Sequence, residues 1–166
     1  IKFELYEGGI RAPFVAWWPG VIPAGSESGH ISAHWDMLPT FAELAGSPHT
    51  EEIDGISMAP LLTGRVADQA QHGHLYWEAY NGGVRQAVRK GKWKLIRHNA
   101  VDVKAQKLEL YDLETDLGET TNLAEQQPGR TAELLSLMQA SHVPNEHYAL
   151  IPMPKKPKKG KVGGKK

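Results

Sequence analysis

Cysteine is absent from the 166 residues of this sequence. That absence excludes disulfide bonds and thiolate metal sites, but it leaves the compartment open, because a cysteine-free chain suits both cytosol and periplasm. Long apolar runs are absent too: no stretch approaches the roughly 20 consecutive apolar residues that a transmembrane helix needs. The first nine residues hold two glutamates and no apolar run, so we do not expect a signal peptide within them.

The formal net charge is zero, but the charge is unevenly distributed. Seven of the nineteen basic side chains follow Pro154, at Lys155, Lys156, Lys158, Lys159, Lys161, Lys165 and Lys166. The preceding residues therefore carry about −7, which is not typical of a nucleic-acid-binding domain with basic residues clustered on a folded face. The tail lacks an apolar face and interleaved aromatics, so we expect residues 151–166 to be disordered and solvated rather than to bind phosphate backbones or membranes.

The first third of the chain has the pattern of an α/β domain. Residues 14–18 form a short apolar run bounded by prolines, which predicts a strand buried on both faces of a parallel sheet. Residues 36–46 predict a helix, with Pro39 in its first turn and Gly46 just after its end. The apolar side of this helix is expected to consist of Leu38, Phe41, Ala42 and Ala45.

After about residue 66 the pattern changes to short strands. Residues 74–80, 84–98 and 107–113 predict strands, and Gly91 with Lys92 divides the second into two, giving four antiparallel strands. Pro128 opens a helix that reaches to about residue 142. We expect the packed face of the sheet to come from Tyr76, Val88, Trp93, Leu95, Leu110 and Leu113. The predicted domains are residues 1–66, 67–150 and the tail 151–166.

Histidine pairs invite a metal hypothesis: His72 with His74, His30 with His34, and His142 with His147. No carboxylate accompanies them at a recognised metal-ligand spacing, so we expect surface or core histidines and no metal site. For His34 and Trp35, an alternative is a place beside a substrate pocket.

The opening segment is the most informative part of the sequence. Residues 6–13 read YEGGIRAP, and Lys2 stands five residues before Glu7. Four later segments follow in order: DMLPT with LAG at 36–46, DGIS with PLLTG at 54–64, RKGKWKLI at 89–96, and ELYDL at 109–113 followed by Asp116, Glu119, Asn122 and Leu123. Together they resemble the formylglycine-dependent, arylsulfatase-like sulfatases over residues 2–142. Each motif alone is weak, but five in register are specific.

The resemblance implies the end of an alkaline-phosphatase-like α/β sheet domain, followed by a small C-terminal subdomain of four antiparallel strands packed with a helix. It implies hydrolysis of sulfate esters of a sulfated small molecule or glycan, in the periplasm or outside the cell. The family uses a formylglycine nucleophile and Ca²⁺, whose ligands we expect N-terminal to Ile1, because the sequence has no Ser-x-Pro-x-Arg, Asp-Asp or Gly-Asp-Asn motif. We therefore expect no catalytic or metal-binding residue here and no turnover by this chain alone.

The resemblance assigns a sulfate contact to Lys2, whereas a lone lysine near a terminus is otherwise a solvated charge. For Gly8 and Gly9 we expect a tight turn, and for Glu7 and Arg11 an ion pair that braces it rather than a catalytic role. One departure is Asp116-Leu117-Gly118, where the family has Asp-Pro before the glutamate.

Two alternatives to a sulfatase remain: a phosphonate or phosphate monoester hydrolase of the same superfamily, and a non-catalytic structural module. Because the strand at 14–18 would expose an unpaired edge, we also expect the chain to self-associate.

Overall fold

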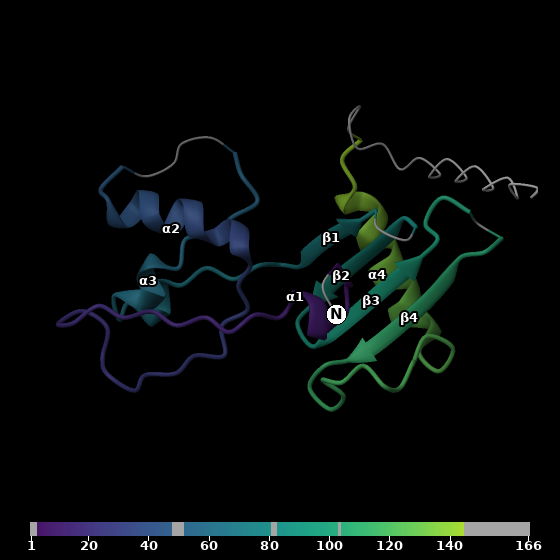
Figure 1. The fold of residues 1–166 in the computed structure, drawn as a ribbon, viewed down its shortest axis with the longest axis horizontal. Coiled ribbons are helices and arrows are strands. Elements are labelled where there is room, and N and C mark those ends of the chain that lie inside the picture. Colours follow the sequence, from purple (N-terminus) through teal and green to yellow (C-terminus); the bar gives the residue numbers. More distant parts are fainter. Residues whose placement is uncertain (1–2, 48–51, 81–82, 103, 145–166) are drawn as a thin grey trace, which may run out of the picture.

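The computed structural model describes residues 3–47, 52–80, 83–102 and 104–144. Lys2, His147 and the lysine-rich tail therefore lie outside the described residues. Figure 1 shows two parts side by side, a loop-rich part with α2 (Met37–Leu44) and α3 (Ala59–Leu62) and a sheet with α4 (Pro128–Ser141). Two single-turn 3₁₀ helices, His34–Asp36 and Val66–Asp68, complete the loop-rich part. No described helix is long and apolar enough to span a bilayer.

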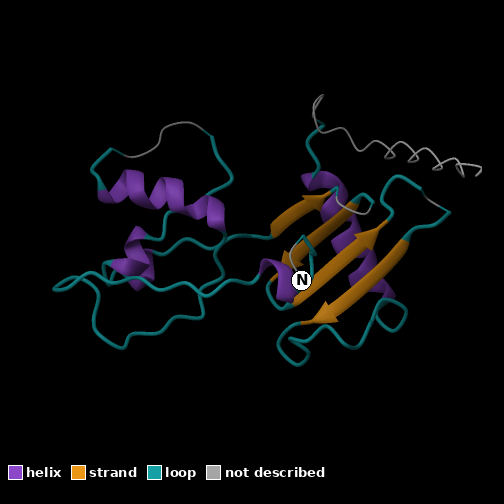
Figure 2. Cartoon of the chain, in the orientation of Figure 1, coloured by secondary structure: helices purple, strands orange, loops and turns teal. Residues whose placement is uncertain are grey.

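The sheet has four antiparallel strands in sequence order: β1 (Leu75–Ala79), β2 (Arg85–Lys90), β3 (Trp93–His98) and β4 (Lys107–Asp112). This meander confirms the four strands expected from the sequence (Figure 2). The turn between β2 and β3 has only two residues, and Lys90 pairs with Trp93 across it. Gly91 adopts φ +57°, a left-handed conformation that glycine tolerates without steric cost, so the predicted break falls where the turn requires it.

The two faces of the sheet bury different clusters. On one face α4 inserts Leu134 and Met138, both fully buried, against Val88, Leu95 and Leu110. The opposite face is covered by residues 5–10, which include the single-turn helix α1 (Glu7–Ile10). The predicted packed face is correct for five of its six members, but Leu113 belongs to the cluster on the α1 face, because side chains alternate between the two faces and Leu113 comes three residues after Leu110.

The strand predicted at residues 14–18 is wrong for this structure. The segment is extended, but no strand pairs with it in the described part of the chain. Val15 and Trp17 are 88% and 85% exposed, so the run is not buried on either face. A strand requires a neighbour to accept its backbone hydrogen bonds, and none of the four strands of the described sheet offers one to this segment.

The predicted helix at 36–46 forms as α2, but its apolar side is not covered. Leu38 and Phe41 are 55% and 63% exposed, whereas Thr40 is buried and accepts a hydrogen bond from the Met58 backbone N–H at 2.8 Å. α2 is thus fastened to the residue before α3 through its polar side. The apolar sides of α2 and residues 14–18 together leave the loop-rich part with a large exposed apolar surface.

Candidate functional site

The segment around α1 carries the residues that the sequence motif YEGGIRAP singles out, Glu7, Gly8, Gly9 and Arg11. Lys2 lies outside the described residues. Glu7 is 5% exposed and opens α1, and Gly8 and Gly9 lie within this single helical turn. The Arg11 guanidinium lies 3.7 Å from Glu7 Oε2, as an i,i+4 pair, and its backbone N–H closes α1 on the Glu7 carbonyl at 2.8 Å.

Glu7 has a closer partner in the sheet. Lys94, the second residue of β3, is fully buried and donates from Nζ to Glu7 Oε1 at 2.9 Å. The same ammonium lies 2.8 Å from Glu119 Oε1, and Glu119 Oε2 accepts the backbone N–H of Glu7 at 2.5 Å. Arg89 of β2 adds a longer contact of 3.6 Å to Glu7 Oε2. One buried lysine therefore holds two buried carboxylates, one from α1 and one from the loop after β4.

Burying these three charges together has a clear energetic consequence. Each ion loses its hydration, and only the mutual contacts and hydrogen bonds offset that loss. Removing Lys94 alone would take from the two carboxylates the buried cation that they share and leave only the longer contacts of Arg11 and Arg89 to Glu7, and breaking a buried ion pair in this way typically costs about 3–5 kcal/mol. The backbone of Glu119 adopts φ +54°, an uncommon conformation for a residue other than glycine, which aims its side chain at Lys94.

At Asp116-Leu117-Gly118, where the sequence lacks the proline of the family pattern, the Asp116 side chain stabilises the turn. The Asp116 carboxylate accepts the backbone N–H groups of Thr120 and Thr121 at 2.9 and 2.8 Å and also the Thr120 hydroxyl. These bonds lower the pKa of Asp116 and close the turn that presents Glu119. The turn is therefore fixed by the aspartate without a proline.

A second polar cluster lies on the same face of the sheet, centred on Glu109 of β4. Its carboxylate accepts hydrogen bonds from Tyr6 Oη at 2.5 Å, His98 Nε2 at 3.0 Å and Tyr111 Oη at 3.1 Å, and Lys107 Nζ lies 2.6 Å away. Burial opposes ionisation and is the largest single influence, but the bonds from Lys107, Tyr6 and His98 together lower the pKa of Glu109 to about 2. Burial and the neighbouring carboxylate raise the pKa of both tyrosines, so they remain neutral donors.

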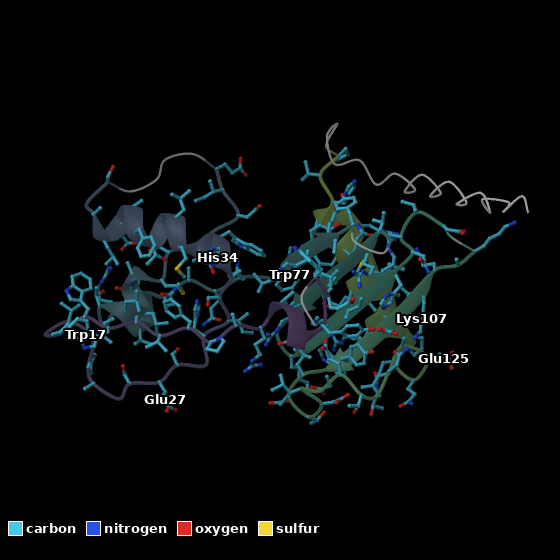
Figure 3. The ribbon with its side chains drawn as sticks, viewed as in Figure 1. Trp17, Glu27, His34, Trp77, Lys107 and Glu125 are labelled. Atoms are coloured by element: carbon cyan, nitrogen blue, oxygen red, sulfur yellow. The ribbon has the colours of Figure 1, made fainter. Side chains whose placement is uncertain are left out.

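A groove of about 800 Å³ runs between the loop-rich part and the sheet. Figure 3 shows His34 and Trp77 near this junction, and both line the groove, as do Trp35, Arg11 and Arg89. The predicted neighbours His34 and Trp35 thus face a groove, in which Trp35 and Trp77 lie 5.9 Å apart, centroid to centroid. The two arginines supply positive charge to this groove, and Glu7 balances part of it.

Three of the paired histidines, His72, His74 and His142, contact polar side chains. His72 Nε2 lies 3.0 Å from both oxygens of the buried Asp36, and His74 bonds Ser141 Oγ at 2.7 Å. His142 Nδ1 contacts Glu78 at 2.6 Å. Among the residues that the structure describes, no group of three or more His, Cys, Asp or Glu side chains could hold a metal ion.

Asp36 organises the loop-rich part through its carboxylate. Oδ2 accepts the backbone N–H of Ala33 at 2.7 Å, and Oδ1 accepts that of Ile56 at 2.9 Å. With the contact from His72, this fully buried side chain joins the start of α2 to two distant loops. Its role is to shape the wall of the groove.

Sequence reasoning missed Lys94 and Glu119 as partners of Glu7. A signal for Lys94 was present in the alternation of β3: Trp93 and Leu95 face α4, so Lys94 shares the other face with the buried Ile96. A lysine on a buried face needs an acidic partner, and Glu7 was already a residue of interest, so a Lys94–Glu7 ion pair could have been predicted. No comparable local pattern marks Glu119.

Comparison with known proteins gives consistent matches. The sequence profile of the family "N-sulphoglucosamine sulphohydrolase, C-terminal" matches residues 2–143. An ulvan-active sulfatase of Formosa agariphila is 33% identical over 74% of this chain and 30% of its own length. Human arylsulfatase A is 33% identical over 82% of this chain and 31% of its own length. The chain therefore spans about a third of the length of these curated relatives.

A solved structure in complex with its substrate, D-glucosamine-2-N,6-O-disulfate, superposes with a TM-score of 0.60. It is 28% identical and covers 75% of this chain and 26% of its own. The fold expected from the sequence motifs is therefore that of the matching proteins.

Proposed function

Since this chain belongs to the sulfatase family "N-sulphoglucosamine sulphohydrolase, C-terminal", we propose that it is the C-terminal part of an enzyme that hydrolyses sulfate esters. The observation that carries this proposal is the family match over residues 2–143, which includes Lys2 and the turn of Glu7, Gly8 and Gly9. Hydrolysis of a sulfate ester needs cations on the sulfonyl oxygens, and an ammonium group supplies one. In this proposal Lys2 contacts a sulfate oxygen, whereas Glu7, Gly8, Gly9 and Arg11 shape the turn that follows it.

The described residues do not fit a calcium site, and the sequence has neither a cysteine nor a Ser-x-Pro-x-Arg motif that could supply the formylglycine. We therefore assign the nucleophile and the Ca²⁺ ligands to parts of the protein outside this sequence, and we derive no step through them. The proposed substrate is a sulfated small molecule or glycan. The substrate of the solved relative favours a sulfated amino sugar as the first glycan to test. A periplasmic or secreted location accompanies this proposal.

The test uses the longer protein that contains this chain. We expect it to release sulfate, measured by ion chromatography, from an aryl sulfate or from glucosamine 6-sulfate. Lys2→Ala should lower kcat by about a hundredfold, as loss of one charge-stabilising donor does in other enzymes. The matched control is Lys104→Ala, which removes an exposed lysine and should leave kcat unchanged.

Two results would contradict the proposal. Faster release of phosphate from phenyl phosphate, or of phenol from a phosphonate monoester, would favour the other hydrolases of the superfamily. No turnover of any ester would favour a structural module. The 166-residue chain alone should be inactive, and calcium-dependent hydrolysis by it would show that the site is complete within this sequence.

A further inference from the structure

The groove between the loop-rich part and the sheet combines two kinds of lining side chain. Arg11 and Arg89 carry positive charge, whereas Trp35 and Trp77 contribute aromatic rings. Its volume of about 800 Å³ falls within the range of pockets that hold small organic ligands, roughly 300–1,000 Å³. Figure 3 shows Trp77 at the junction of the two parts. This combination favours a ligand that has both an anionic group and an apolar face.

The positive charge of the groove is only partly neutralised. Among the described residues, Glu7 is the only acidic side chain that lines it. The guanidinium groups of Arg11 and Arg89 lie 3.7 and 3.6 Å from the same oxygen, Glu7 Oε2, and both distances exceed the roughly 2.7–2.9 Å of a charge-assisted hydrogen bond. The other oxygen, Oε1, accepts a hydrogen bond from Lys94. Two guanidinium groups therefore share one carboxylate that is already paired with a third cation, so the groove retains positive charge.

Arg89 has the more firmly held guanidinium group of the two. Its side chain is 19% exposed, against 56% for Arg11, and its Nε donates to the Gly91 carbonyl oxygen at 3.0 Å. This hydrogen bond fixes the orientation of the planar group. A guanidinium held in this way presents its remaining donors in set directions, which suits the oxygens of a sulfate or carboxylate group.

The two tryptophans come from different parts of the fold. Trp77 belongs to β1 and packs against the buried cluster on the α1 face, whereas Trp35 lies in the 3₁₀ helix that ends at Asp36. Their ring centroids are 5.9 Å apart and their planes are tilted by 55°. Both rings are thus held by regular elements, so a ligand can contact a large aromatic area at little cost in conformational entropy. The C–H groups on one face of a sugar ring pack well on such rings.

We propose that this groove binds an anionic sugar unit, whose sulfate or carboxylate group contacts Arg89 and Arg11 and whose ring packs against Trp35 and Trp77. This inference rests on the proposed function, because a sulfatase that acts on glycans meets such units in its substrate. It assigns to this part of the protein a share in holding the glycan. All four contacting side chains lie in the described part of the chain.

The test is a calorimetric titration of the longer protein with defined tetrasaccharides. EDTA is present, because removal of the expected Ca²⁺ keeps the ligand from being hydrolysed. We expect a heparin-derived tetrasaccharide or tetragalacturonate to bind, with a Kd that rises with salt. The neutral chitotetraose should bind at least about tenfold more weakly, since it offers no charged acceptor. The tighter of the two anionic ligands identifies the anion. Equal affinity for chitotetraose, or no binding of either anionic ligand, would overturn the proposal.

Arg89→Gln tests whether the binding site is this groove. It should raise the Kd of the anionic tetrasaccharide by at least about tenfold, because hydrogen bonds to a charged group are lost. Arg89→Lys keeps the charge but not the planar fork, so it should raise the Kd by a smaller factor. The matched control is Arg130→Gln on α4, which pairs with Glu133 at 2.6 Å and does not line the groove. Equal effects of Arg89→Gln and Arg130→Gln would mean unspecific attraction of charge and would overturn the proposal.

Two further measurements test the sugar contact and guard against misfolding. Trp35→Leu should raise the Kd by about two- to tenfold through loss of an aromatic contact, and an unchanged Kd would overturn the role of the rings. Inorganic sulfate should compete far more weakly than the tetrasaccharide, and equal competition would mean an anion site without a sugar contact. If Arg89→Gln does not fold, Arg11→Gln removes the other guanidinium group at an exposed position and should also weaken binding.

Because binding is measured without turnover, the groove and the proposed function fail separately. Binding that depends on Arg89, in a protein that releases no sulfate from any ester, would contradict the proposed function and support the groove site. Release of sulfate by a protein whose glycan binding is unchanged in Arg89→Gln would contradict only the groove site.

Discussion

Replacing Glu109 by glutamine removes the carboxylate on which four side chains of the α1 face converge. The carboxylate is 5% exposed, and its pKa is lowered from 4.5 to about 2. Burial alone would raise that pKa, so the donors Lys107, Tyr6 and His98 must overcome it. A difference of about 2.5 pKa units corresponds to about 3 kcal/mol of stability linked to ionisation.

The sign of the pH dependence follows from the lowered pKa. The folded state favours the ionised carboxylate, so its contribution is complete above about pH 4.5 and disappears as the pH falls toward about 2. At pH 7 Glu109→Gln should lower the free energy of unfolding by about 2–3 kcal/mol, since a glutamine retains one weaker acceptor. The difference between the two proteins should then shrink steadily below pH 4.5.

Urea unfolding followed by tryptophan fluorescence at a series of pH values from 7 to 3 measures this difference. Glu125→Gln, which removes an exposed carboxylate, is the control and should change the free energy of unfolding by less than about 0.5 kcal/mol. A Glu109→Gln effect that is as large at pH 3 as at pH 7 would refute the ionisation argument. An effect no larger than that of the control would show that the cluster does not stabilise the sheet.

Two further substitutions test the packing of each part of the chain. Gly55→Ala should lower the free energy of unfolding by about 2 kcal/mol, because the new Cβ would lie 2.5 Å from the Trp35 carbonyl oxygen and 3.0 Å from Pro39 Cγ. Gly73→Ala is the control, because its new Cβ would have nothing within 4 Å. Equal urea midpoints for the two variants would contradict this prediction. Leu134→Ala should lower the free energy of unfolding by about 2–5 kcal/mol, measured from the urea midpoint, because it opens a cavity under α4. An unchanged midpoint would show that α4 is loosely packed.

The sequence was sufficient for the elements whose pattern is local. Residues 84–98 predict two strands with Trp93 and Leu95 on the packed face, and Gly91 marks the turn between the strands. The ion network was not predictable in the same way, because Glu7 and Lys94 are 87 residues apart and Glu7 and Glu119 are 112 apart. Only the folded sheet brings them together. The proposed roles of Lys2 and Arg11 stay predictions.

The run at residues 14–18 shows a different limit of local patterns. Its apolar residues predict a buried strand, but a strand also depends on a neighbour that the pattern does not specify. In the structure Trp17 is 85% exposed and the extended backbone has no strand partner in the described part of the chain. An apolar, extended segment with unpaired N–H and C=O groups readily pairs with another chain. We therefore interpret the run as a surface that is covered when the longer protein is assembled.

This interpretation predicts self-association of the 166-residue chain. Sedimentation velocity at increasing protein concentration should show oligomers, and replacing Val15 and Trp17 by serine should shift the distribution toward monomer, because it removes two of the most exposed apolar side chains of the run. Val143→Ser, which alters a valine that is 79% exposed beyond α4, is the control and should leave the distribution unchanged. A well-folded monomer formed by the unsubstituted chain would contradict the prediction. It would mean that the run is stable in water as an extended segment, and a covering partner would then be unnecessary.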